Sequence, residues 1–203
     1  MQENQSIQLV TTTATAAHVW LDRPDIGHRH SDGRYKVSLV MEPDDPGFIE
    51  LRDSCIQLAQ VAWPSENGEL PEWVNMPYQD GNQRINPKTG EVIDRFKGRF
   101  LVTARTQYQP VIVDEERNEL KAGVHVRAGD LIRLSVTCQA YGLDRKPSGI
   151  ALRLRGVQLM QRRPFQPANA EDLFPSHPKQ TSFPIPMSRV PQPIPTENWH
   201  EQV

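Results

Sequence analysis

Two segments near the end of the chain, residues 130–141 and 149–160, alternate between apolar and polar side chains in a way that could build a binding surface. Successive side chains of a strand point to opposite faces, so each segment would present one apolar face and one polar face. A sheet with an arginine-and-aromatic face is suited to a polyanionic strand that carries bases, although exposed arginines also occur on ordinary solvated surfaces. The polar-face candidates for binding are Arg133, Tyr141, Arg153 and Arg155.

Positive charge is concentrated in two blocks, although the formal net charge of the 203 residues is only −2. Residues 84–105 carry a net charge of +4, and residues 145–163 carry +6. Attraction of a polyanion depends on the local field rather than on the total charge. The first block therefore adds these candidates for the same role: Arg84, Arg95, Lys97, Arg99 and Arg105.

Aromatic residues lie in or beside a long, polar, turn-rich stretch at residues 64–95. Long loops in compact domains are usually functional or mobile. We therefore expect Trp73, Tyr78 and Phe96 either to stack on bases or to pack the loop onto the domain. Strand alternation places Tyr108 on the same face as Phe100, inside, and the remaining aromatic candidates for the core are Trp20 and Trp63.

Strand patterns dominate the first 165 residues, in the ranges 6–21, 33–45, 96–114, 130–141 and 149–160, with an interruption of the first at residues 15–17. One helix is predicted, with Asp45 as its cap and Pro46 in its first turn, ending at Trp63 and Pro64. About five strands with one early helix favour a small closed barrel over a parallel sheet. The fold class is therefore β-rich, with one helix and a long loop.

The composition changes near Phe165, because residues 166–203 hold eight of the eighteen prolines. Such a segment cannot bury enough apolar surface to offset its ordering, so we expect 1–165 to be the folded domain and 166–203 a disordered tail. Within the tail, residues 170–174 resemble the end of sliding-clamp-binding peptides. The partner-binding candidates are Asp172, Leu173 and Phe174, and the milder interpretation is a proline-rich docking arm.

Other chemistry finds little support in the sequence. Cys55 and Cys138 lie in apolar contexts and are expected to be buried thiols in a reducing cell. His28 and His30 are too isolated to predict a metal site, and no catalytic arrangement or cofactor motif is apparent. With no signal peptide and no membrane-spanning run, we expect a cytoplasmic protein that is not an enzyme.

The order of several short motifs resembles a family of single-stranded DNA-binding proteins from tailed phages, once described as a domain of unknown function. The resemblance covers about residues 15–165. Its elements are Leu21 with Pro24, Tyr35-x-Val37-x-Leu39, an acidic turn into a helix, and the segments 77–81, 98–106, 110–114, 140–142 and 149–158. It implies an OB-fold barrel that coats single-stranded DNA in phage replication or recombination, with replication proteins as partners of the tail.

We therefore predict sequence-independent binding through phosphate neutralisation and base stacking, without catalysis, in the bacterial host cytoplasm if the protein is phage-encoded. Two alternatives come from other classes. One is a virion or scaffold protein that docks a partner through its proline-rich tail. The other is a metal-dependent nuclease, which requires carboxylates that converge on a divalent ion.

Overall fold

The computed structural model describes residues 6–27, 31–65, 67, 69–121, 124–143 and 147–164. The chain divides into two units, Met1–Pro164 and Phe165–Val203. The second unit lies outside the described residues, and so do His28, His30 and the motif of Asp172, Leu173 and Phe174. The predicted disordered tail therefore stays a prediction.

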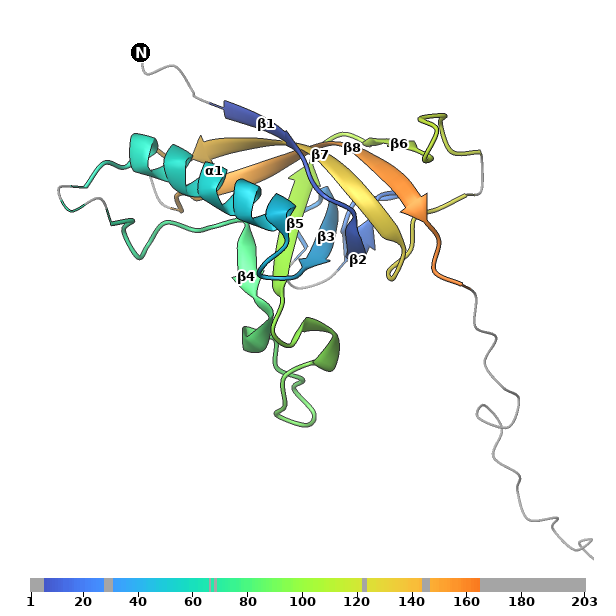
Figure 1. Ribbon diagram of the computed structural model, residues 1–203, viewed down its shortest axis with the longest axis horizontal. Helices are drawn as coiled ribbons and strands as arrows, with labels where there is room; N and C mark the ends of the chain where they lie inside the picture. Colours follow the sequence, from blue (N-terminus) through green and yellow to red (C-terminus); the bar gives the residue numbers. More distant parts are fainter. Residues whose placement is uncertain are drawn as a thin grey trace, which may run out of the picture. The chain divides into compact units, whose positions relative to one another are not determined.

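In the described part of the chain, eight strands form one sheet, and five of them close into a barrel (Figure 1). Around the ring, β7 pairs β2, β2 pairs β3, β3 pairs β5, β5 pairs β8, and β8 returns to β7. All of these pairs are antiparallel except β5–β8. This order confirms the predicted OB-fold barrel. The bounds are β1 Ser6–Val10, β2 Ala14–Trp20, β3 Tyr35–Met41, β4 Tyr78–Asp80, β5 Phe100–Thr106, β6 Val111–Val113, β7 Leu131–Tyr141 and β8 Gly149–Gln161.

The one α-helix within the described residues, α1 (Pro46–Ala62), forms where the sequence predicts it. The Asp45 carboxylate accepts the backbone N–H groups of Gly47 and Phe48 at 2.8 and 3.1 Å, and Pro46 occupies the first turn. Such a cap stabilises a helix by ~1 kcal/mol. The helix packs one apolar face against β7 and β8 (Figure 1). Its buried residues are Phe48, Leu51, Cys55, Leu58 and Ala59.

The barrel interior confirms the predicted alternation in β7 and β8. Their inward residues are at most 2% exposed over most of the length, namely Ile132, Leu134, Val136, Cys138, Ile150, Leu152 and Leu154. Cys55 and Cys138 are free and buried, with their sulfur atoms 3.9 Å apart. That contact and burial raise the pKa of Cys55, which keeps its thiol protonated.

A bulge in β2 overturns the prediction that Trp20 belongs to the core. His18 has φ +40, and the register with β3 shifts between Ala17 and Trp20. A one-residue shift exchanges the two faces of a strand. Val19 therefore packs against the core, whereas Trp20 pairs with Lys36, whose side chain points outward. The predicted break in the first strand is also misplaced, because the strand stops at Val10 and resumes at Ala14.

The prediction that Tyr108 faces inward is also wrong. Alternation holds only within a strand, and β5 ends at Thr106. The chain bends at residues 107–108, and Tyr108 is 70% exposed. Trp63, by contrast, is partly buried and packs against the core as expected. The outer surface therefore gains two aromatic rings that the sequence pattern assigned to the interior.

Candidate nucleic-acid interface

A row of polar side chains crosses the outside of the barrel at one register level. Lys36 on β3 is the partner of Arg105 on β5, and Arg105 is the partner of Arg153 on β8. The same level continues through Thr137 on β7 to Gln8 on β1. Adjacent strands lie about 4.8 Å apart, so three cations stand side by side. We call Lys36, Arg105, Arg153, Thr137 and Gln8 the outer row.

Two carboxylates from the connection between β2 and β3 neutralise part of this row. Asp25, which is only 5% exposed, forms an ion pair with the Lys36 ammonium. The Asp32 carboxylate lies 3.3 Å from a guanidinium nitrogen of Arg105. Among the described residues, Arg153 makes no ion pair, and its side chain is exposed. Among the described residues of the row, Arg153 is therefore without an ion pair, and its neighbour Arg105 has one partly exposed ion pair, with Asp32.

An open groove of about 300 Å³ lies over the arginine end of the row. Its walls come from β5, β7, β8 and the bend after β5, and they include no acidic residue. Tyr108 contributes an exposed ring to one wall. A groove with guanidinium groups and an aromatic ring can hold phosphates and bases together. The polar and aromatic lining residues are Arg34, Arg105, Thr106, Gln107, Tyr108, Gln139 and Arg153.

Trp20 extends the row at its other end. It pairs with Lys36 across β2 and β3, so both side chains leave the barrel on the same side. The ring is partly exposed, and the Arg23 guanidinium lies 5.9 Å from its centroid. Aromatic rings beside a cationic track are suited to stacking with bases of any identity.

The segment 81–99, which projects from the barrel beside the ends of β4 and β5 (Figure 1), brings the other basic block to the same surface. Phe96 is 1% exposed and packs with Ala17 and Leu101 on the outside of the sheet. Phe96 therefore anchors the segment and is not a free stacking ring. Behind it, partial burial and then the charges of Arg84, Arg95 and Lys36 lower the pKa of His18. The His18 ring lies 5.8 Å from the ring of Phe96, so the anchored segment sits beside the bulge of β2.

The remaining basic candidates lie in different places. Arg155 is exposed and donates to the side chain of Gln8, at the end of the outer row. Arg99 is paired with Glu42 at 2.7 Å, and Lys97 is exposed at the end of the short helix Asp94–Phe96. Arg133 lies apart from the row, in a 280 Å³ apolar groove with valines of β1 and β6. The Nε–H of Arg133 donates to the carbonyl oxygen of Thr11 at 3.3 Å.

The aromatic candidates differ in the same way. Tyr141 lies on the outer face of β7, two residues beyond Gln139, and is partly exposed. Tyr78 packs edge-on against Phe48 and Phe100, at ring distances of 5.7 and 6.2 Å, and burial raises its pKa. Trp73 packs edge-on against Trp63 at 5.8 Å, with 42% of its side chain exposed. Of the three, only Tyr141 shares a surface with the row.

Among the cationic and aromatic residues of this surface, sequence reasoning missed Trp20, Arg34, Lys36 and Tyr108. The signal for Lys36 is present, because the alternation in residues 35–41 already places it opposite the apolar face. Trp20 and Tyr108 depend on a bulge and on a strand end, which alternation alone cannot locate. Arg34 directly precedes Tyr35, the register partner of the groove residue Thr106, and so reaches the groove at the end of β5.

A closed five-stranded barrel of this order, with one cationic and aromatic outer face, belongs to the OB-fold class. The model of the Enterobacter phage Enc34 ssDNA-binding protein family matches residues 7–181, and the chain belongs to this family. A comparison with curated proteins gives no match.

Solved structures agree on the fold. The single-stranded DNA-binding protein of bacteriophage Enc34 in complex with ssDNA is 18% identical, with a TM-score of 0.57, over 79% of this chain and 88% of that chain. The single-stranded DNA-binding protein gp2.5 of bacteriophage T7 is 14% identical, with a TM-score of 0.58, over 88% of this chain and 99% of that chain.

The described part of the chain has no helix long and apolar enough to cross a membrane. It also has no group of three or more His, Cys, Asp or Glu side chains placed to hold a metal ion. Asp45 caps α1, and Asp114 accepts hydrogen bonds from the Asn118 backbone and side chain in a turn. These carboxylates therefore have structural partners of their own.

Proposed function

We propose that this protein binds single-stranded DNA independently of sequence, in phage DNA replication and recombination, through the outer row and the groove over it. The observation that carries the proposal is the register of Lys36, Arg105 and Arg153 on three adjacent strands. Membership of the Enc34 ssDNA-binding family supports the choice of ligand. The site of action is the cytoplasm of the host cell.

Affinity comes mainly from the phosphates. Each phosphate that a cation neutralises releases a counterion, which gives a slope of about −0.7 per phosphate in a plot of log K against log salt for single strands. Trp20, Tyr108 and Tyr141 supply stacking surfaces on the same side of the barrel. Stacking tolerates every base and phosphate contacts carry no sequence information, so sequence preference is small.

Binding without catalysis is part of the proposal, and the family supports it because its description names DNA binding alone. The nuclease alternative predicts cleavage that depends on a divalent metal ion. The virion or scaffold alternative predicts no affinity for single strands. Recruitment of replication proteins through Asp172, Leu173 and Phe174 remains a proposal from the sequence.

Fluorescence anisotropy with labelled single-stranded DNA, duplex DNA and single-stranded RNA, at two salt concentrations, tests the function. We expect binding to be tightest to a single strand and weaker at higher salt, with no cleavage in Mg²⁺ or Mn²⁺. If about three to five phosphates are neutralised, the salt slope is about −2 to −3.5. Equal affinity for blunt duplex, or affinity independent of salt, would contradict the proposal.

A further inference from the structure

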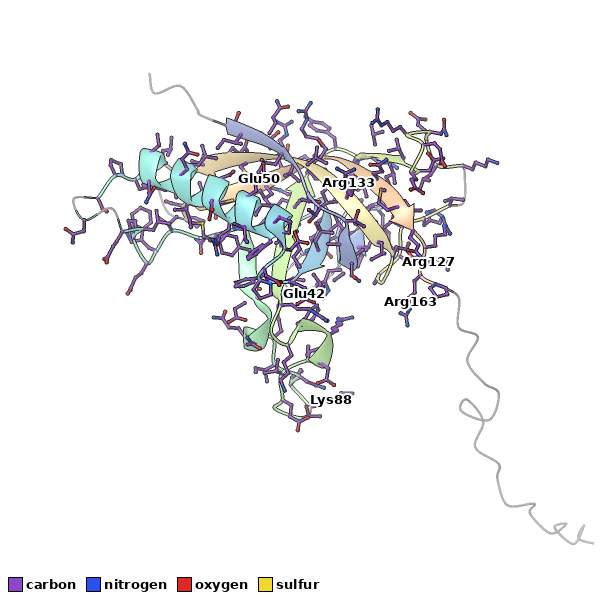
Figure 2. The ribbon with its side chains drawn as sticks, in the orientation of Figure 1. Glu42, Glu50, Lys88, Arg127, Arg133 and Arg163 are labelled. Carbon is purple, nitrogen blue, oxygen red and sulfur yellow. The ribbon has the colours of Figure 1, made fainter. Side chains whose placement is uncertain are left out.

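A second basic pocket, of about 340 Å³, lies between the end of the barrel and the segment 81–99. Its charged lining residues are three arginines and one glutamate: Arg95, Arg99, Arg163 and Glu42. Figure 2 shows Glu42 at the end of β3, Arg163 beyond the end of β8, and Lys88 near the tip of the segment 81–99. We call this the Arg163 pocket.

The position of Arg163 is built into the fold. Its backbone N–H donates to the carboxylate of Asp130 at 2.9 Å, and Asp130 is only 3% exposed. The other oxygen of Asp130 accepts the N–H of Arg127 at 2.8 Å. The Arg163 side chain then lies over Gly129, where a Cβ would meet its Cδ at 2.7 Å. Gly129 has φ +96, a backbone conformation that favours glycine.

The opposite wall comes from the segment 81–99. The Arg95 guanidinium lies 4.5 Å from the ring centroid of Phe96, which is buried against the sheet. Arg99 donates to Glu42 at 2.7 Å and to the Arg95 carbonyl oxygen at 3.3 Å. Glu42 is 55% exposed and is the one acid in the pocket lining, so the arginines exceed it by two charges.

Arg95 links this pocket to the outer row. Its guanidinium lies on the ring of Phe96, which is 5.8 Å from the ring of His18 on β2, and it also lines the pocket beside Arg163. Along β3, Lys36 and the pocket residue Val40 are four residues apart, which is about 13 Å. The cationic side chains therefore follow one path, from Arg153 across Arg105 and Lys36 to Arg95 and the pocket.

We propose that the Arg163 pocket binds a phosphodiester group of the same single strand that the outer row binds, so that it lengthens the site. This inference rests on the proposed function. An incoming phosphate exchanges with the Glu42 carboxylate for the Arg99 guanidinium, because a guanidinium can donate paired hydrogen bonds to two oxygens of either anion. A short strand that fills the groove over the row does not reach the pocket, whereas a long strand occupies both.

Strand length separates the two sites. Affinities are measured by anisotropy for oligonucleotides of about 4 and about 16 nucleotides, the limits observed for one OB fold. Arg95→Ala with Arg163→Ala should weaken binding of the long strand by ~10-fold or more and leave the short strand unchanged, since each charge-assisted hydrogen bond contributes about a factor of ten. The salt slope for the long strand should become shallower by about 0.7 for each phosphate that is no longer neutralised.

Two further variants control for charge and folding. Arg52→Ala with Arg117→Ala removes the same charge from exposed sites on α1 and in the 114–119 turn, and should change neither affinity. Glu42→Gln should strengthen binding of the long strand alone, because it frees Arg99 without loss of volume. A misfolded protein would not gain affinity, so this variant tests the pocket even if the double variant is unstable.

The outcomes distinguish this inference from the proposed function. If the wild-type protein binds neither strand, the proposed function fails. If both strands bind and the Arg95/Arg163 variant binds them as tightly as wild type, the pocket inference is overturned while the function stands. An equal loss for both lengths, or no gain with Glu42→Gln, also overturns the pocket as an extension of the site.

Discussion

Arg105 and Arg153 are register partners across β5 and β8, the one parallel strand pair that closes the barrel. Like charges directly opposite each other on a sheet are unfavourable. One of the two is held by Asp32, and the other makes no ion pair within the described residues. A phosphate bound between them relieves this repulsion, which is the physical reason for placing the interface here.

Replacing Asp32 by asparagine should strengthen DNA binding. The change frees Arg105 from its exposed ion pair, while the amide oxygen can still accept the Arg34 N–H. Exposed pairs contribute about 0.2–1 kcal/mol, so the expected gain in affinity is up to about fivefold. Asp53→Asn, which removes the similar pair with Arg52 on α1, is the matched control and should have no effect. Weaker binding by Asp32→Asn would contradict this account.

Trp20 should contribute stacking to the interface. Trp20→Ala is expected to lose about 1–3 kcal/mol of binding free energy, and Trp20→Phe should lose much less because it keeps an aromatic face. Trp73→Ala is the matched control, since that ring packs on Trp63 outside the row. Titration of each variant with single-stranded DNA measures the difference. If Trp73→Ala weakened binding more than Trp20→Ala, the interface would lie elsewhere.

The free protein should lose stability in mild acid through His18. Partial burial, followed by Arg84, Arg95 and Lys36, lowers the pKa of His18 from its usual 6.5. Well above pH 6.5 the ring is neutral in both states. As the pH falls below 6.5 the unfolded chain takes up the proton first, so the free energy of unfolding decreases.

The measurement is the thermal melting temperature at pH 7.5 and pH 5.5, for the wild type and for His18→Asn. Asparagine tolerates the positive φ of this position better than most residues. The melting temperature of the wild type should fall further from pH 7.5 to pH 5.5 than that of the variant. Equal losses would show that His18 does not titrate in this window.

A glycine at position 149 should be required for stability, because the loop at Asn75 packs closely against the start of β8. Its Cβ position lies 2.2 Å from the carbonyl oxygen of Asn75, which accepts the N–H of Ile150 at 2.9 Å. Gly149→Ala is therefore expected to cost about 1–3 kcal/mol of unfolding free energy in a urea titration. Gly156→Ala, where the nearest atom is 3.4 Å away, is the control and should cost less. Similar costs for both would argue against a tight approach at Asn75.

Much of the fold can be predicted from alternation and capping. Residues 130–141 and 149–160 form strands with the predicted faces, and Asp45 caps the predicted helix. These features are local, because a strand face and a helix cap depend on neighbours within a few residues. The same alternation assigns the arginines at 105 and 153 to outer faces.

The remaining part of the site depends on long-range pairing. The sequence shows that Arg105 and Arg153 point outward but not that they are register partners, since register is set between strands far apart in the chain. Trp20 reaches the outer face through a bulge, and Phe96 is buried by packing of the segment 81–99. Arg163 is positioned by its backbone hydrogen bond to the Asp130 carboxylate, 33 residues away in the sequence.

The most direct test of the interface is the affinity of Arg105→Ala with Arg153→Ala for labelled single-stranded DNA, measured across a range of salt concentrations. Both side chains are exposed, so the melting temperature should stay close to that of the wild type. We expect affinity for all sequences to fall alike, with the salt slope shallower by about 0.7 for each phosphate that the variant does not neutralise. A folded double variant with wild-type affinity and slope would contradict the assignment of the outer row as the DNA-binding surface.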